Sequence, residues 1–282
     1  MNIVRTALLL AALTALLLAI GWLAGGGKGV AIALALALVL DFVAIWKSDG
    51  LVLGMVGAVA LDRRAVPALY AIVERLAAKA GMPAPRLYIC ESAQPNAFAT
   101  GRDSAHAVIC VTSGLLDHLS SDEVAAVVAH ELAHIRHQDS QVMTVTASLA
   151  GAIGMLPNFG WFFGGVRRDG QSGPLGWLGA VLAVLLAPLA ALLVQLTISR
   201  VREFTADDEA ARLCGHPLWL ASALERLDYA AACIPNYDVE AHPATAHLFI
   251  VNPLAGRRFD RLFATHPGTP ERIARLRRMA EE

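Results

Sequence analysis

The chain has 282 residues, of which 56% are hydrophobic and 17% charged, and it carries a formal net charge of −1 with a mean hydropathy of +0.53. These values exceed what the core of a soluble protein needs and indicate membrane-spanning segments. No basic patch with interleaved aromatic residues occurs, so we expect no nucleic-acid partner, and the four cysteines lack the Cys-x-x-Cys spacing of a thiolate zinc site.

Two apolar runs follow each other at the start of the chain, over residues 6–24 and 30–46. The glycine-rich stretch 25–29 between them suits the tight turn of a helical hairpin. A cleaved secretory signal would also begin with a positive charge and an apolar stretch. The first run is longer than the core of a usual signal, however, and the second run follows at once. We therefore predict an uncleaved transmembrane hairpin over residues 1–48.

The next part of the chain predicts a small sheet placed before a long helix. Residues 65–80 show the apolar spacing of an amphipathic helix. Two short runs rich in β-branched or aromatic residues, 86–90 and 107–111, predict strands, and a turn signal lies between them. The long helix that follows is capped by Ser120 or Ser121.

That long helix contains the sequence His-Glu-Leu-Ala-His at residues 130–134. Two imidazoles four residues apart, His130 and His134, lie on one helix face one turn apart, so both can reach a single metal ion. This is the zincin pattern, and it predicts hydrolysis of peptide bonds with zinc. The alternative is an exposed helix whose histidines and glutamate are merely solvated. A catalytic zinc ion would need at least one more protein ligand.

Two further apolar stretches, 142–163 and 175–198, follow the histidines. They form either a second transmembrane hairpin or a re-entrant pair that never crosses. If a third ligand lies beyond them, they must together cross the bilayer an even number of times. Positively charged residues precede the first span of this hairpin and follow its second span. Because such residues favour the cytoplasmic side of a membrane, we expect the termini and the zinc site in the cytoplasm. We predict about four transmembrane helices, with the second hairpin over 142–198.

Several carboxylates after His134 are candidates for the third ligand. Asp139 would lie near the end of the same helix, with its carboxylate pointing away from a metal held by both histidines. Glu203 and Asp207 are better placed, because a spacing of four puts both on one helical face. Glu203 could then bind zinc while Asp207 accepts the outer N–H of a ligand histidine and fixes its orientation. The alternative is a charged helix in which these carboxylates pair with neighbouring arginines.

Further motifs extend over most of the chain from about residue 95 onward. They are Pro-Asn-Ala-Phe-Ala-Thr-Gly at 95–101, the zincin motif at 130–134, the stretch 199–207, Ala-His-Leu-Phe-Ile at 246–250 with Asn-Pro-Leu at 252–254, and Thr-His-Pro at 265–267 followed by Glu-Arg-Ile at 271–273. With these motifs in this order, the chain resembles the HtpX-like bacterial membrane metalloproteases. These are relatives of the CAAX-prenyl endoproteases in the gluzincin group.

The resemblance implies one zinc ion per chain, bound by His130, His134 and Glu203. It also implies that Glu131 is the general base and that Asp207 holds a ligand histidine. The fold we expect is mainly α (α+β): a gluzincin-type protease core with a small β-sheet, joined to about four transmembrane helices in two hairpins.

The resemblance further implies which residues meet the substrate. Asn96 and Ala97 are expected on an edge strand that pairs with the substrate backbone, a mode that gives affinity with little demand on sequence. His266 and Arg272 match residues that in the relatives point at the developing oxyanion. We therefore expect His266 to be catalytic and Arg272 to bind substrate. For His266 the alternative is a loop histidine that precedes the final helix.

These predictions divide the chain into four parts. They are the transmembrane hairpin 1–48, a protease part 49–141 with the sheet and the zincin helix, the second membrane hairpin 142–198, and a C-terminal helical protease part 199–282 with the third zinc ligand.

The resemblance implies a multi-pass zinc metalloendopeptidase of the bacterial cytoplasmic (inner) membrane. It would cleave misfolded or damaged membrane proteins, or unfolded polypeptides, on the cytoplasmic side, in quality control and the stress response. A prenyl-protein endoprotease is an alternative, although such enzymes have more membrane spans than the sequence shows. The sequence also allows a membrane-anchored zinc-binding scaffold without catalysis, or a soluble secreted metallopeptidase.

Overall fold

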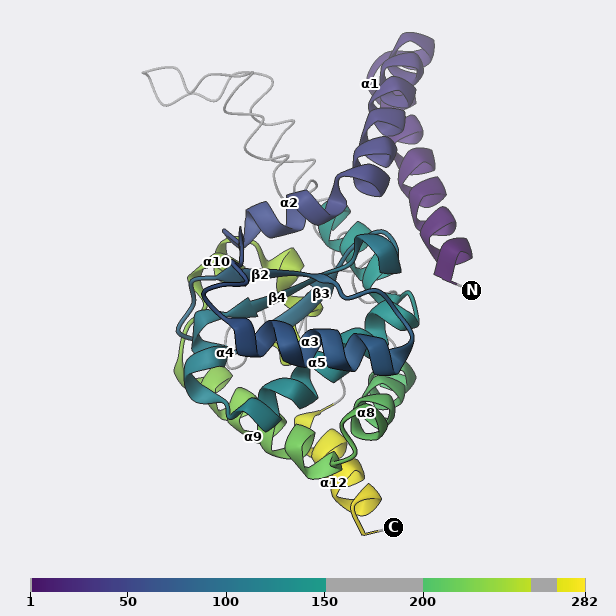
Figure 1. Cartoon of the computed structure of the whole chain (residues 1–282). Coiled ribbons are helices and arrows are strands. Elements are labelled where there is room, and N and C mark those ends of the chain that lie inside the picture. Colours follow the sequence, from purple (N-terminus) through teal and green to yellow (C-terminus); the bar gives the residue numbers. More distant parts are fainter. Residues whose placement is uncertain (1, 151–199, 255–267, 282) are drawn as a thin grey trace.

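The computed structural model describes residues 2–150, 200–254 and 268–281. It shows a mainly helical body with a small mixed sheet, from which a long helical hairpin projects (Figure 1). The helices are α1 (Asn2–Trp46), α2 (Ser48–Met55), α3 (Pro67–Ala80), α4 (Ser113–His118), α5 (Ser121–Arg136), α8 (Arg200–Cys214), α9 (Pro217–Cys233), α10 (Tyr237–Ala241) and α12 (Thr269–Met279), with short 3₁₀ turns η1 (Ser104–His106) and η2 (Pro243–Leu248). The strands are β1 (Val59–Ala60), β2 (Arg86–Cys90), β3 (Ala97–Thr100) and β4 (Val108–Thr112).

The sheet has the strand order β1-β2-β4-β3, and its two central strands are the ones predicted from their β-branched and aromatic residues. β2 and β4 run parallel with Leu87 opposite Ile109, whereas β1 and β3 pair antiparallel with their neighbours. β3 lies at one edge of the sheet, as the resemblance implies, and pairs Ala97 with Val111. β1 was not predicted, because it consists of two residues with exposed side chains and shows no apolar alternation.

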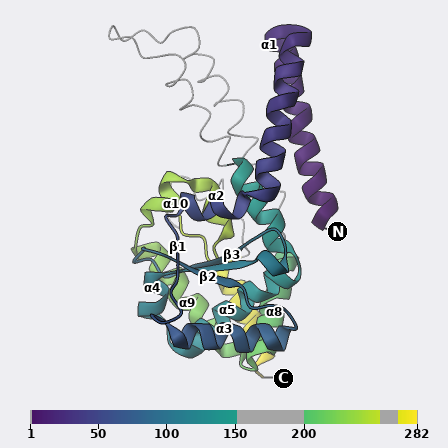
Figure 2. The same ribbon diagram turned by 45° about the horizontal axis from the view of Figure 1, so that its top comes forward.

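The sheet separates two apolar cores, because successive side chains along a strand point to opposite faces. In β4, Ile109 and Val111 belong to the core shared with α3, α5, α8 and α9, whereas Val108 and Cys110 belong to the core shared with α2 and α10. Figure 2 shows α2 and α10 on one side of the sheet and α3 and α5 on the other. The amphipathic helix predicted over 65–80 is α3, which buries its apolar face.

A capping box begins α5, the helix that contains the zincin motif. The Ser120 Oγ accepts a hydrogen bond from the backbone N–H of Glu123 at 3.3 Å, and the Glu123 carboxylate accepts one from the backbone N–H of Ser120 at 2.8 Å. Of the two serines predicted as caps, Ser120 is therefore the cap. The box satisfies two N–H groups that have no partner within the helix and fixes where α5 starts.

Replacing Ser120 by alanine is expected to lower the free energy of unfolding by about 1 kcal/mol, because the helix loses its cap. Urea unfolding of the full chain in detergent measures this loss. Ser121→Ala, one residue further on, removes a hydroxyl that is not the cap and should have a much smaller effect. Equal losses in the two variants would contradict the assignment of the cap.

α1 is a helical hairpin that breaks at Gly25 and Gly26, where Gly26 has a φ of 54° (Figure 1). Its two arms come so close near the turn that a Cβ on Gly21 would lie 2.5 Å from the carbonyl oxygen of Gly29. Further along, the hydroxyl of Thr14 donates a hydrogen bond of 2.9 Å to Asp41, the acidic residue of the second arm. The glycines therefore allow the turn and the close approach, and the threonine satisfies one carboxylate oxygen within an apolar hairpin.

The second arm of α1, Gly25–Trp46, is the one helix among the described residues that is long and apolar enough to cross a membrane, with a mean hydropathy of 2.4. Large apolar side chains such as Ile32 and Phe42 are exposed on it, as lipid contact requires. The stretches predicted as a second hairpin, 142–163 and 175–198, fall largely outside the described residues. The described beginning of the first stretch is helical and buried.

Candidate metal and active site

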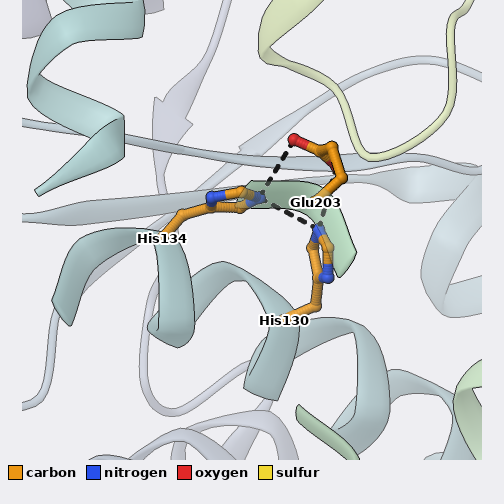
Figure 3. A group of neighbouring side chains, drawn as sticks. All are labelled: His130, His134 and Glu203. Atoms are coloured by element: carbon orange, nitrogen blue, oxygen red, sulfur yellow. Dashed lines mark hydrogen bonds and ion pairs between the residues drawn. The ribbon is translucent and has the colours of Figure 1, made fainter. Parts of the chain in front are cut away.

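Two helices bring three potential metal ligands together. α5 presents His130 and His134 one turn apart, and α8, which packs against α5, presents Glu203 from its first turn (Figure 3). The Nε2 atoms of the two histidines are 3.1 Å apart. The Glu203 carboxylate oxygens lie 3.8 Å from Nε2 of His130 and 3.6 Å from Nε2 of His134. The three residues predicted as ligands therefore meet at one point, although 69 positions separate Glu203 from His134 in the sequence.

The three donor atoms fit a zinc ion in kind and spacing. They all lie within 4.8 Å of one another, and two donors bound to a tetrahedral zinc at about 2.1 Å would be roughly 3.4 Å apart. Two imidazole nitrogens and a carboxylate oxygen are a ligand set of catalytic zinc sites, which keep a fourth position for water. All three side chains are buried. The residues present thus fit the predicted metal.

A second carboxylate of α8 holds His130 from behind. Oδ1 of Asp207 lies 3.0 Å from Nδ1 of His130, so that an Nδ1–H can be donated to it and the Nε2 lone pair faces the ligand cluster. Burial, together with the positive charge of Arg272, lowers the pKa of His130 to about 4. This shift favours the neutral ring, which is the form that binds a metal. Asp207 lies where its spacing from Glu203 predicts.

Arg272 of α12 lies behind the same pair. Its Nε and Nη2 donate to the two carboxylate oxygens of Asp207 at 2.8 and 2.7 Å, and its Nη1 donates to the carbonyl of Ile250 at 2.8 Å. Burial opposes the ionised carboxylate, yet the Arg272 charge lowers the pKa of Asp207 to about 2. Arg272 is only 1% exposed. This geometry favours a role in holding Asp207 over the substrate contact predicted for Arg272.

Glu131 follows the first histidine and faces the edge of the sheet. The backbone of Ala99 in β3 acts to lower the pKa of its carboxyl group. Burial, with a contribution from the Glu203 carboxylate, raises the pKa of Glu131 to about 7, although the neighbouring His134 opposes the shift. A carboxyl group with a pKa near neutrality is suited both to accept a proton and to return it.

Comparison with known proteins identifies the family of this site. The sequence model of peptidase family M48 matches residues 64–280. The chain belongs to peptidase family M48. It is therefore a metallopeptidase, and His130, His134 and Glu203 are a group that could hold its metal.

Two individual proteins are similar to this M48 chain. A protease HtpX homolog of Acidiphilium cryptum (strain JF-5) is 58% identical over 280 residues, which cover 99% of this chain and 97% of that protein. The resemblance inferred from the motifs is thereby confirmed. The crystal structure of S. mikatae Ste24p matches with a TM-score of 0.45 at 22% identity, over 84% of this chain and 58% of Ste24p.

The edge of β3 is partly occupied in this M48 chain. The carbonyl of Ala97 accepts a hydrogen bond of 3.0 Å from the backbone N–H of Ile250. The side chain of Asn96 is buried, with its Nδ2 donating to the carbonyl of Val251 at 2.8 Å and its Oδ1 accepting from the N–H of Ala97 at 3.1 Å. Asn96 therefore fastens the segment around Val251 to the edge strand. The substrate contact predicted for Asn96 and Ala97 stays a prediction.

The prediction that Asp139 lies near the end of the zincin helix was wrong. α5 ends at Arg136, so Asp139 does not continue the zincin helix, and its Oδ2 lies 3.4 Å from Nδ1 of His134. Its Oδ1 accepts a hydrogen bond of 3.0 Å from Arg202 of α8. Burial opposes the shift, but the carboxylates of Glu203 and Asp139 raise the pKa of His134 to about 9. Sequence reasoning missed Asp139 as a partner of His134 and Arg202 as a partner of Asp139.

Two other histidines of the motifs lie apart from this cluster or beyond the described residues. His247 is buried and its Nε2 lies 3.1 Å from the carbonyl oxygen of Met143, so it is a structural histidine. His266 falls in the stretch 255–267, which lies outside the described residues. Its role at the oxyanion stays a prediction.

Proposed function

We propose that this chain is a membrane-embedded endopeptidase that uses one zinc ion, held by His130, His134 and Glu203. The observation that carries the proposal is the convergence of these three donors beside the Glu131 carboxylate, at the edge of a small sheet. Membership of a metallopeptidase family supports the reaction class, and the donor set supports zinc.

Each residue around the metal position has a separate role in the proposed hydrolysis of the peptide bond. A bound zinc ion would supply a Lewis acid for the scissile carbonyl and would lower the pKa of a water molecule. Glu131 accepts the proton of the attacking water and returns it to the leaving amine, as its place beside both histidines and its raised pKa allow. Asp207 keeps the Nε2 of His130 directed at the metal position. His266 is the proposed donor to the oxyanion.

The edge strand supports an extended polypeptide as the substrate. The helix that carries Glu131, α5, packs against β3, so a segment that adds to β3 would pass close to Glu131. At Ala97 the carbonyl already bonds Ile250. A substrate strand therefore either pairs beyond Ala97, toward Ala99, or displaces the segment around Ile250. Recognition through main-chain groups requires an unfolded segment of the substrate but places little restriction on its amino-acid sequence.

The protease parts of the chain alternate with segments that we propose to be membrane hairpins. We propose the four-part division of the chain, with membrane hairpins over 1–48 and 142–198 and protease parts over 49–141 and 199–282. The projecting α1 hairpin and its apolar second arm support the first membrane hairpin. The positively charged residues that precede and follow that hairpin support an active site on the cytoplasmic side of a bacterial inner membrane.

A site that accepts unfolded segments beside a bilayer is suited to removing misfolded or damaged membrane proteins. Quality control under stress is therefore the physiological role we propose. A prenyl-protein substrate would need a chamber for the lipid, and no feature of the described residues favours one. A zinc-binding scaffold without catalysis would make no use of a buried Glu131 beside the edge strand.

Proteolysis by the purified full chain tests the proposal. The protein, in detergent or liposomes, is incubated with an unfolded membrane protein, with and without a zinc chelator, and the products are separated by electrophoresis. We expect cleavage that the chelator stops and added zinc restores. Cleavage that continues in the chelator, or a protein that binds no zinc, would overturn it. A prenylated peptide offered in parallel reports the alternative substrate class.

A further inference from the structure

A short turn with a left-handed residue joins the zincin helix to the next helix. α5 ends at Arg136, and helical structure resumes at residue 139. Between them Gln138 has a φ of 59°, the only positive φ of a non-glycine residue in the described parts of the chain. This left-handed conformation is unfavourable for a residue with a Cβ and persists where its surroundings impose it. The left-handed turn therefore points to a constraint at this position.

The consequence of this turn is the position of the Asp139 carboxylate. In a continuous helix, a residue five positions after His134 would be rotated from it by roughly 140° and could not reach its ring. The left-handed turn instead brings Oδ2 of Asp139 to 3.4 Å from Nδ1 of His134. Asp139 is 2% exposed, so its carboxylate needs a compensating charge. Arg202 supplies one, with Nη1 donating to Oδ1 at 3.0 Å.

The two histidines are supported in the same manner from opposite directions. His130 has Asp207 behind its Nδ1, and Asp207 is held by Arg272. His134 has Asp139 behind its Nδ1, and Asp139 is held by Arg202. A carboxylate that accepts the Nδ1–H of a ligand histidine fixes the tautomer with the Nε2 lone pair free for metal, and it fixes the ring orientation.

We propose that Asp139, held by Arg202 and turned back at Gln138, is a positioning residue that orients His134 toward the metal. The inference deepens the proposed function, because it rests on His134 being a zinc ligand. Arg202 directly precedes Glu203 on α8. The Asp139–Arg202 ion pair therefore also ties the helix that carries Glu203 to the ligand on α5, so that one contact sets the relation between two ligands.

Zinc affinity of the full chain in detergent, measured by competition with a chelator, tests the proposal. We expect Asp139→Ala and Arg202→Met each to weaken zinc binding by about 10- to 100-fold. Asp139→Asn keeps the shape and one acceptor oxygen, so it should lose less affinity than Asp139→Ala. Gln138→Gly relieves the backbone without touching the contact, and it should retain the affinity of the unaltered protein.

The control is the ion pair of Arg136 with Glu209, which also joins α5 to α8, at 2.6 Å, and touches no proposed ligand. Glu209→Gln should leave zinc affinity unchanged. Unchanged zinc affinity in Asp139→Ala, or an equal loss of affinity in Glu209→Gln, would overturn the positioning role. The proposed function would still stand in that case, provided that the unaltered protein binds zinc. Absence of zinc from the unaltered protein would overturn both. If Asp139→Ala does not fold, as judged by thermal unfolding of the metal-free protein, Asp139→Asn and Arg202→Met decide.

Discussion

Replacing Glu131 by glutamine is expected to reduce the rate of peptide-bond cleavage by about 10²- to 10⁴-fold, the contribution typical of a positioned general base. Glutamine has nearly the shape of glutamate, but its amide cannot take a proton from water near neutral pH. The zinc content of the variant should stay at that of the unaltered protein, because the three proposed ligands are untouched. Single-turnover cleavage of an unfolded substrate, together with metal analysis, measures both quantities.

The matched control is Glu123→Gln on the same helix. Glu123 is also a buried glutamate of α5, but its carboxylate bonds the backbone of Ser120 and the hydroxyl of Ser222 instead of facing the edge strand. Its replacement should lower stability and leave the rate for the folded protein close to that of the unaltered chain. Full activity in Glu131→Gln would exclude it as the general base. A scaffold without catalysis would show no cleavage before or after the substitution.

The ligand cluster could be predicted because each part of it follows a helical period. Two histidines at a spacing of four share one helix face, and so do Glu203 and Asp207, so each pair forms its own half of the site. Sequence cannot show that two such faces meet. The zincin pattern predicted that they meet, because a catalytic zinc ion needs a third protein ligand. In the structure α8 packs against α5.

The parts that sequence did not predict depend on single backbone conformations or on side chains far apart in the chain. Gln138 belongs to a residue type that rarely adopts a left-handed conformation, so no sequence signal announces the turn that brings Asp139 back to His134. The amide of Asn96 donates to the carbonyl of Val251, far along the chain, and no local sequence pattern indicates this contact. β1 is too short to show an alternating pattern.

Replacing Arg272 by methionine is expected to lower the free energy of unfolding of the metal-free protein by about 3–5 kcal/mol. The substitution keeps much of the apolar stem but leaves the Asp207 carboxylate, which is 0% exposed, without its charged partner. A buried carboxylate in that state must stay ionised at a high cost or take up a proton. Denaturant unfolding at neutral pH, with the metal removed, measures the loss.

The same two helices offer a matched exposed ion pair. Arg275 of α12 donates to both oxygens of Asp208 of α8 at 2.8 and 2.7 Å, with side chains 44% and 17% exposed. Arg275→Met should cost less than about 1 kcal/mol, because water solvates the remaining carboxylate. The double variant Asp207→Asn with Arg272→Met should recover part of the stability that Arg272→Met loses.

These variants also distinguish the two roles considered for Arg272. If the guanidinium chiefly holds Asp207, Arg272→Met loses stability and zinc affinity together, because His130 loses its oriented partner. If it chiefly meets the oxyanion, Arg272→Met keeps its stability and its zinc while the cleavage rate falls. The bidentate contact at 2.7 and 2.8 Å and the burial of both side chains lead us to expect the first result. Stability equal to that of Arg275→Met would contradict it.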